Sequence, residues 1–114
     1  MNDYRNELEL VENWLVHSGI QDQSSEKIKH GGVYAWFDKS VSSYAFLSSE
    51  ITGYALTWLT YQYTSTKNEV YRLRADDAAT WLVERALDTK SGGVLCRHDG
   101  KNWRHQICAF CNGM

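Results

Sequence analysis

Five cysteine and histidine side chains lie within a sixteen-residue stretch near the end of the chain. Thiolate and imidazole are preferred ligands of tetrahedral zinc, and the C-x-x-C spacing of the last two cysteines is typical of half a structural zinc site. The other half has the spacing C-x-H, which matches no common zinc pattern, and buried cysteines also serve as small apolar residues. Structural zinc, redox chemistry at the C-x-x-C pair and inert thiols therefore remain alternative interpretations. The five residues are Cys96, His98, His105, Cys108 and Cys111.

Two carboxylates, Glu50 and Asp38, are candidates for acid–base catalysis. Glu50 stands at a predicted helix start, where the helix dipole favours the ionised form, with Tyr54 one turn further along the same face. It could act as a general base or accept a sugar hydroxyl, but a first-turn carboxylate also stabilises its own helix by about 0.3–1 kcal/mol. Asp38, beside Trp36, is the other candidate of a catalytic pair. Two-carboxylate glycoside hydrolysis needs a defined separation between the groups, which a sequence does not supply.

The aromatic content is high for so short a chain: fifteen of 114 residues are aromatic, and five of these are Trp. Each large ring buries about 150–250 Å² and fills a small core efficiently, but rings also line grooves for ligands. Trp103 is flanked on a predicted ribbon by Arg97 and Arg104, a set suited to sugar or anion contact, although strand charges are more often simply solvated. The rings therefore have two interpretations, core packing and ligand contact.

Charge and hydropathy exclude several function classes. Twelve Lys and Arg against fourteen Asp and Glu give a net charge of −2 without a basic block, so we expect no nucleic-acid partner. No apolar run approaches the roughly 20 residues of a membrane span, and the first residues lack the pattern of a signal peptide. These observations predict a cytoplasmic protein without a membrane partner. The length fits a single domain over residues 1–114.

Hydrophobic periodicity predicts a mainly α protein, and the absence of proline suits uninterrupted helices. Ser48 or Ser49 can cap the second helix and Asn68 the third, and the short connection between these helices predicts an antiparallel αα-hairpin. The second helix is expected to direct inward the stripe Ile51, Tyr54, Ala55, Trp58, Leu59 and Gln62. Helices are expected over about residues 3–17, 50–66 and 68–88, a loop over 21–32 and an extended segment over 33–37.

The pair Asp99-Gly100 between two β-prone runs predicts a short C-terminal β-hairpin over about residues 94–105. With a two-residue turn, His98 faces Lys101 across the ribbon. Side chains alternate between the two faces of a strand, so this register decides which of them lie together. The residues expected on one face are Cys96, His98, Trp103 and His105.

The run Glu50-Ile51-Thr52-Gly53-Tyr54, followed by Trp81-Leu82 late in the next helix and then Gly92-Gly93-Val94, resembles one hairpin of the α/α toroid enzymes. These enzymes form the six-hairpin glycosidase-like superfamily, with its epimerase and lyase relatives. There, an E-x-T-G-Y helix start precedes a helix that closes in a W-L pattern, a glycine pair and a short strand. The resemblance covers about residues 31–114. It implies an all-helical, sugar-related fold whose inner helix ends and loops shape a cavity.

A complete ring of twelve helices needs on the order of 300 residues, so three long helices predict a partial α/α toroid, an α/α hairpin array. We expect a fragment, or a short homologue that completes its core as a homodimer, because an incomplete helical layer leaves an apolar face. The leading hypothesis is a carbohydrate-processing or carbohydrate-binding toroid fragment. If active it would be a sugar-related hydrolase, lyase or epimerase, but we expect it to be catalytically incomplete alone. Ligand contacts are expected from Trp36, Glu50, Tyr54 and Trp103.

The competing hypothesis is a small helical protein-interaction module without catalysis, with or without a zinc ion that staples the C-terminal ribbon. The two hypotheses differ in an observable property. A zinc-stapled module loses structure with a chelator, because the energy of structural metal binding is folding energy. A toroid fragment is indifferent to the chelator and self-associates.

Overall fold

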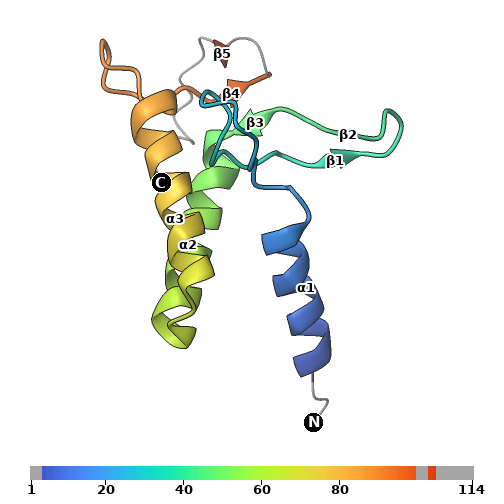
Figure 1. The fold of residues 1–114 in the computed structure, drawn as a ribbon. Coiled ribbons are helices and arrows are strands. Elements are labelled where there is room, and N and C mark those ends of the chain that lie inside the picture. The colour runs from blue at the N-terminus through green and yellow to red at the C-terminus, as the bar shows by residue number, and fades with distance from the viewer. Residues whose placement is uncertain (1–3, 100–102, 105–114) are drawn as a thin grey trace.

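A computed structural model describes residues 4–99 and 103–104 of the chain, and helices dominate it (Figure 1). The mainly α prediction is therefore confirmed. Two of the three helices closely match their predicted spans. The helices are α1 (Arg5–His17), α2 (Ser49–Thr66) and α3 (Glu69–Trp81), the last continued by a π-helical turn, η1 (Leu82–Ala86).

The third helix is shorter than predicted. Its α-helical part ends at Trp81, and the chain then widens into η1, whose closing bond runs from the Leu87 amide to the Leu82 carbonyl at 2.9 Å. Leu87 is already extended, with ψ 123°. It forms an isolated antiparallel bridge with Val94, so the start of the strand-like region ends the helix before residue 88.

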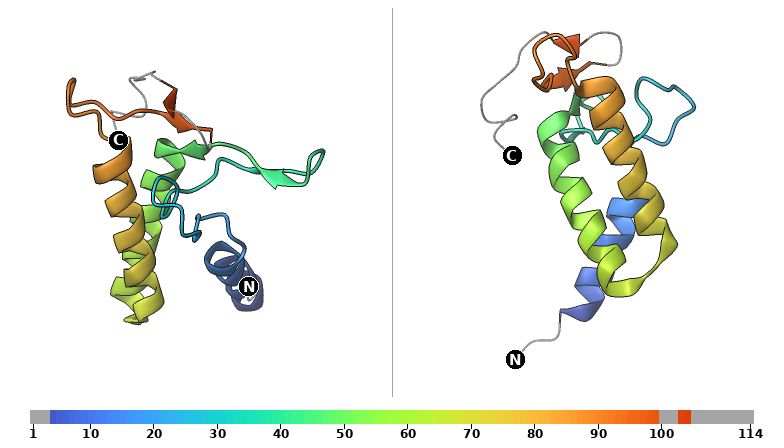
Figure 2. Two further views of the ribbon diagram at one scale, coloured as in Figure 1. Left: turned by 45° about the horizontal axis from the view of Figure 1, so that its top comes forward. Right: turned by 90° about the vertical axis from the view of Figure 1, so that its left-hand side faces the viewer.

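Local polar side chains begin α2 and α3 as predicted. The Ser48 hydroxyl accepts a 3.3 Å hydrogen bond from the Ile51 amide, and the Asn68 side chain accepts one of 3.1 Å from the Val70 amide. Each satisfies a backbone N–H that the first helical turn leaves without a partner. Only Lys67, in the left-handed region at φ 59°, and Asn68 connect the two helices. The result is the predicted antiparallel αα-hairpin, with both helices side by side in Figure 2.

Short antiparallel strands lie at one end of this hairpin (Figure 1). One pair forms a two-stranded ribbon before α2. The strand directly before α2 pairs with the C-terminal ribbon to give a three-stranded sheet of order β3-β4-β5, a pairing that the sequence did not indicate. The strands are β1 (Phe37–Asp38), β2 (Ser43–Tyr44), β3 (Leu47–Ser48), β4 (Arg97–His98) and β5 (Trp103–Arg104).

The register of the C-terminal hairpin differs from the predicted one. His98 lies opposite Trp103 rather than Lys101, and Arg97 lies opposite Arg104. The partner of His98 is therefore two positions further along the chain than predicted. A shift of two residues preserves the alternation of faces, so His98 and Trp103 still share a face. Their rings meet edge to face, with centroids 5.1 Å apart.

The core lies where this sheet meets the end of α3. Leu47, Trp81 and Ala86 are almost completely buried there, and Trp103 packs on Trp81 with ring centroids 5.2 Å apart. Thr52 connects the extended segment to α2. Its hydroxyl accepts a 2.9 Å bond from the Val33 amide and donates one of 2.6 Å to the Ser48 carbonyl.

Helix α1 lies to one side of the α2–α3 hairpin in Figure 1 and in the left-hand view of Figure 2. The side-chain amide of Gln62 on α2 donates a 3.0 Å hydrogen bond to the Glu12 carboxylate and so connects the two helices. Several apolar side chains of α1 remain exposed to solvent, among them Leu8 and Val11, as does Tyr4 directly before the helix. Among the residues that the structure describes, no helix combines the length and the apolar character that crossing a membrane requires.

Candidate functional site

A cavity of about 510 Å³ opens between α1, the extended segment 33–37 and α2. Its volume lies within the range of about 300–1,000 Å³ that is usual for small-molecule sites. Aromatic rings make up much of its lining. They are Trp14, Tyr34, Trp36, Phe37, Tyr54 and Trp58.

The α2 wall of the cavity is the apolar stripe that the sequence pattern predicts. Ile51, Tyr54, Ala55 and Trp58 follow the i, i+3, i+4, i+7 spacing of one helix face, and all four line the cavity. This part of the stripe therefore borders an open space. Tyr54 is 50% exposed, although it belongs to the face that was expected to point inward.

The opposite wall comes from the extended segment before the first strand. A backbone hydrogen bond of 2.9 Å from Ala35 to the Phe46 carbonyl, and another of 2.9 Å from Ala45 to the Trp36 carbonyl, hold this segment against the chain that returns toward α2. Trp36 is 53% exposed and meets the Phe46 ring edge to face, with centroids 5.2 Å apart. The Trp36 ring is therefore supported on one side while it remains accessible.

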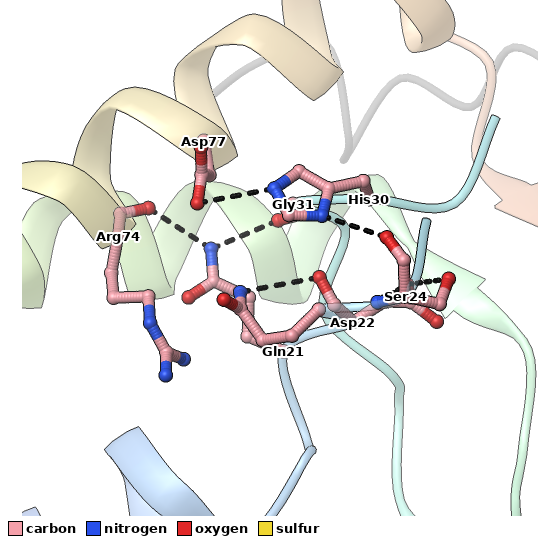
Figure 3. A network of polar contacts seen from close by, with 8 residues as sticks. Gln21, Asp22, Ser24, His30, Gly31, Arg74 and Asp77 are labelled. Carbon is pink, nitrogen blue, oxygen red and sulfur yellow. Dashed lines mark hydrogen bonds and ion pairs between the residues drawn. The ribbon is translucent and has the colours of Figure 1, made fainter. Parts of the chain in front are cut away.

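The loop 21–32 holds the third side of the cavity in place (Figure 3). The amide nitrogen of Gln21 donates to two carbonyl oxygens, those of Gly31 and Arg74, each at 3.0 Å. His30 connects the loop to α3, because its Nε2 lies 3.3 Å from an oxygen of the Asp77 carboxylate. Gln21 and Arg74 both line the cavity, so these contacts fix the polar part of its lining.

Two adjacent glycines allow the loop to approach α3 this closely. Gly31 has φ +94°, and a Cβ there would lie 2.2 Å from the Asp77 carbonyl oxygen. A Cβ on Gly32 would lie 2.7 Å from the Trp81 ring. No other residue type fits these two positions without movement of α3 or of the loop.

Asp22 connects the loop 21–32 to the extended segment 33–37. Its carboxylate accepts hydrogen bonds from the Ser24 amide and hydroxyl, at 2.9 and 2.6 Å, and from the Tyr34 hydroxyl at 2.5 Å. Burial, together with this bond to Asp22, raises the pKa of Tyr34 far above its ordinary value. Tyr34 is therefore a neutral hydrogen-bond donor at physiological pH, held in one orientation at the edge of the cavity.

Arg74 is the one lining residue, of those described, with a charge at neutral pH. Burial lowers the pKa of its guanidinium, and the nearby Asp77 opposes part of this effect. In Figure 3 the guanidinium points away from the loop network, toward the side on which α1 lies. One sequence signal could have indicated this lining position: Arg74 falls on the same helix face as Tyr71 and Ala78, an otherwise apolar stripe.

The predicted sugar-contact residues do not all lie together. Trp36 and Tyr54 line the same cavity, as the ligand hypothesis requires. Trp103 instead packs into the core against Trp81. Arg97 places its guanidinium over the Phe46 ring, 4.4 Å from its centroid, on the residue that also supports Trp36.

The two candidate catalytic carboxylates do not line the cavity. Glu50 is partly exposed in the first turn of α2. Asp38 lies in β1, where its carboxylate accepts bonds of 2.9 and 2.6 Å from the amide and hydroxyl of Ser40. The hydroxyl bond, followed by the amide bond, lowers the pKa of Asp38 below its ordinary value. Asp38 is therefore ionised at neutral pH and unsuited to act as a general acid there.

The proposed zinc ligands are only partly within the described residues. Cys96 and His98 are both buried, and burial lowers the pKa of the His98 imidazole. His105, Cys108 and Cys111 lie outside the described residues. In residues 4–99 and 103–104, no three side chains of the metal-binding types come together.

Comparison of the chain with protein-family models, with curated proteins and with solved structures finds no match. The role of the cavity is therefore inferred from its own residues.

Proposed function

We propose that the aromatic cavity binds a carbohydrate, with Trp36 and Tyr54 as the rings on which the sugar stacks. The observation that carries this proposal is the lining itself: six aromatic side chains around about 510 Å³, with few polar groups. A pyranose ring presents apolar C–H faces and a polar rim. Such a ligand matches a site with aromatic walls and a small number of placed polar groups.

The polar rim would come from Arg74, whose backbone carbonyl is bonded to Gln21 of the loop 21–32, and from polar atoms of the aromatic side chains. The Arg74 guanidinium is the charged group among them, and the tryptophan indoles and the Tyr54 hydroxyl supply further donors. Glu50 and Asp38 lie outside this lining, so we propose ligand binding rather than complete catalysis for this chain.

We further propose that the α2–α3 hairpin and α1 are part of an α/α toroid. Two features support this proposal: the antiparallel hairpin with its two-residue connection, and the apolar side chains that α1 leaves exposed. An incomplete helical layer has such a face until another helix covers it. In this arrangement the cavity would lie between neighbouring helices of the ring.

The experiment is a calorimetric titration of the chain with a panel of neutral and acidic oligosaccharides. Trp36→Ala and Tyr54→Ala each remove one stacking ring and should weaken binding about tenfold, since such a contact is worth roughly 0.5–1.5 kcal/mol beyond its buried area. Tyr61→Ala is the matched control, because Tyr61 is also an exposed tyrosine of α2, at 67%, but lies outside the cavity lining. Equal affinities in all four proteins would contradict the proposal.

A second function, a protein-interaction module, is favoured by the exposed face of α1. Leu8 is 59% exposed, and Tyr4 and Val11 lie on the same face at i−4 and i+3. We propose a homodimer through this face as the alternative, since two-fold pairing commonly covers such surfaces. Sedimentation of the wild-type chain and of Leu8→Glu distinguishes the two: a dimer that Leu8→Glu dissociates supports the module, and a monomer at all concentrations opposes it.

A structural zinc ion remains part of this alternative. Cys96 and His98 are two positions apart, a spacing that puts side chains on the same face of an extended chain, and both are buried. The His98 ring meets the Trp103 ring there. Native mass spectrometry, with and without a chelator, measures the metal directly. A mass increase of one zinc per chain that is lost together with helicity would support this proposal, and an unchanged metal-free mass would oppose it.

A further inference from the structure

The charge of the cavity is concentrated in one side chain. Among the described lining residues, Arg74 alone carries a charge at neutral pH, and every other one is apolar, aromatic or an uncharged amide. No carboxylate is among them. A ligand in this cavity therefore meets a localised positive charge against an aromatic background.

Arg74 differs from Arg72, two residues earlier on the same helix, in the partners of its guanidinium. The Arg72 guanidinium forms ion pairs with Glu69 at 2.7 Å and with Asp76 at 3.0 Å, on the exposed side of α3. No described residue has a side-chain hydrogen bond or ion pair of this kind with the Arg74 guanidinium. Asp77, which lies one turn further along α3, has its carboxylate against His30 instead.

The backbone of Arg74 is held in place, although no residue in the described part of the chain pairs with its guanidinium. Its backbone carbonyl accepts the Gln21 amide at 3.0 Å, which attaches this turn of α3 to the loop (Figure 3). Holding an arginine partly buried without an internal anion costs free energy that a bound anion would recover. The planar guanidinium has five donors in a fork that matches a carboxylate in a bidentate contact.

We propose that the cavity selects an acidic sugar, whose carboxylate binds the Arg74 guanidinium while the sugar ring stacks between the aromatic walls. This inference rests on the proposed carbohydrate-binding function and names the class of its ligand. The carboxylate lies on the sugar itself, so one molecule engages both the rings and the charge. The remaining exposed surface of α3, with Arg72 in its ion pairs, takes no part.

The test compares cellobiouronate with cellobiose, two disaccharides that differ in one carboxylate. Wild-type protein should bind cellobiouronate at least about tenfold more tightly, since a charge-assisted bidentate contact is typically worth that much. Arg74→Gln should abolish this preference, and Arg74→Lys should retain part of it because the charge remains without the fork. Arg72→Gln, two residues away, should leave it unchanged.

The indole N–H signals of the five tryptophans, recorded by NMR, separate loss of binding from loss of fold. In Arg74→Gln the signals of Trp81 and Trp103, which lie in the core, should stay in place. Equal affinity of the wild type for both sugars, or a preserved preference in Arg74→Gln, would overturn the inference and leave the proposed function standing. If neither sugar moved the Trp36 or Trp58 signal, the proposed function and the inference would both be wrong.

Discussion

The indole N–H of Trp81 donates a 3.1 Å hydrogen bond to the backbone carbonyl oxygen of Ile28, 53 residues earlier in the chain. The bond satisfies the polar atom of a ring that is otherwise buried in the core. It also holds the middle of the loop 21–32 against the end of α3. Because this loop positions Gln21 and α3 positions Arg74, the bond connects the core to the candidate ligand site.

The close packing of the loop 21–32 on α3 predicts that two glycine substitutions lower the free energy of unfolding by different amounts. Gly31→Ala should lower the free energy of unfolding by roughly 2–5 kcal/mol, because it combines a positive φ with a contact of 2.2 Å to the Asp77 carbonyl. Gly92→Ala should cost only about 1–2 kcal/mol, since Gly92 has φ +80° but nothing within 4 Å of a Cβ. Urea unfolding of both variants gives the comparison. Similar losses in the two variants would mean that the loop does not pack on α3 in this way.

The buried hydroxyl of Thr52 predicts a loss on isosteric replacement. Thr52→Val should destabilise the fold by about 1–3 kcal/mol, because the Val33 amide loses its acceptor and the site offers no water-exposed replacement. Thr57→Val is the control: Thr57 is exposed and its hydroxyl contacts only the Gly53 carbonyl of its own helix. Thr52→Ser should recover most of the loss in thermal unfolding. A Thr52→Val protein as stable as Thr57→Val would contradict the hydrogen bond between the Val33 amide and the Thr52 hydroxyl.

The hydrogen bond from Gln62 to Glu12 holds α1 beside the cavity, so its removal should loosen this helix. Gln62→Leu should speed amide hydrogen exchange throughout Arg5–His17 by several fold, because few other contacts tether this helix. Exchange in α2 and α3 should change little. Gln23→Leu provides the control, since Gln23 is exposed and contacts only its neighbour Asp22. Unchanged exchange in α1 would show that other contacts hold it.

The hydrogen bonds of the Asp38 carboxylate predict that part of the stability of its turn is lost at acidic pH. Its folded-state pKa lies below the unfolded value of about 3.9, so the turn is stabilised above that pH and loses this stabilisation as the pH falls through the folded-state pKa. Ser40→Ala removes the largest cause, the hydroxyl bond, and should raise the pKa toward its ordinary value. Carbon NMR of the Asp38 carboxyl measures both. A wild-type value at or above about 4 would contradict the described turn.

Local features of the fold follow from the sequence. The caps at Ser48 and Asn68, the αα-hairpin between them and the stripe through Tyr54 each depend on residues a few positions apart. Short-range geometry fixes such contacts, because helix caps and helix faces repeat at constant spacings. The same spacing puts Tyr54 on the face of α2 that lines the cavity, whereas nothing local in the sequence showed that Trp36 lines it too.

Long-range pairings did not follow from the sequence. Leu47 pairs with His98 across 51 positions of the chain, and nothing in either short strand specifies its partner. The hairpin register was missed because the pair Asp99-Gly100 favours a tight turn locally, whereas the packing of Trp103 on Trp81 aligns the strands two residues further on. Arg74 was missed as a lining residue because its place beside the cavity depends on contact with Gln21, 53 positions earlier in the chain.

An NMR titration of the five tryptophan indole signals with cellobiouronate would locate the bound sugar on the protein. We expect shifts for Trp14, Trp36 and Trp58, which line the cavity, and none for Trp81 and Trp103, which lie in the core. Saturable shifts confined to the first three would support a carbohydrate site at this cavity. Shifts that appear only at Trp103 and Trp81, or no shift at saturating sugar, would contradict it.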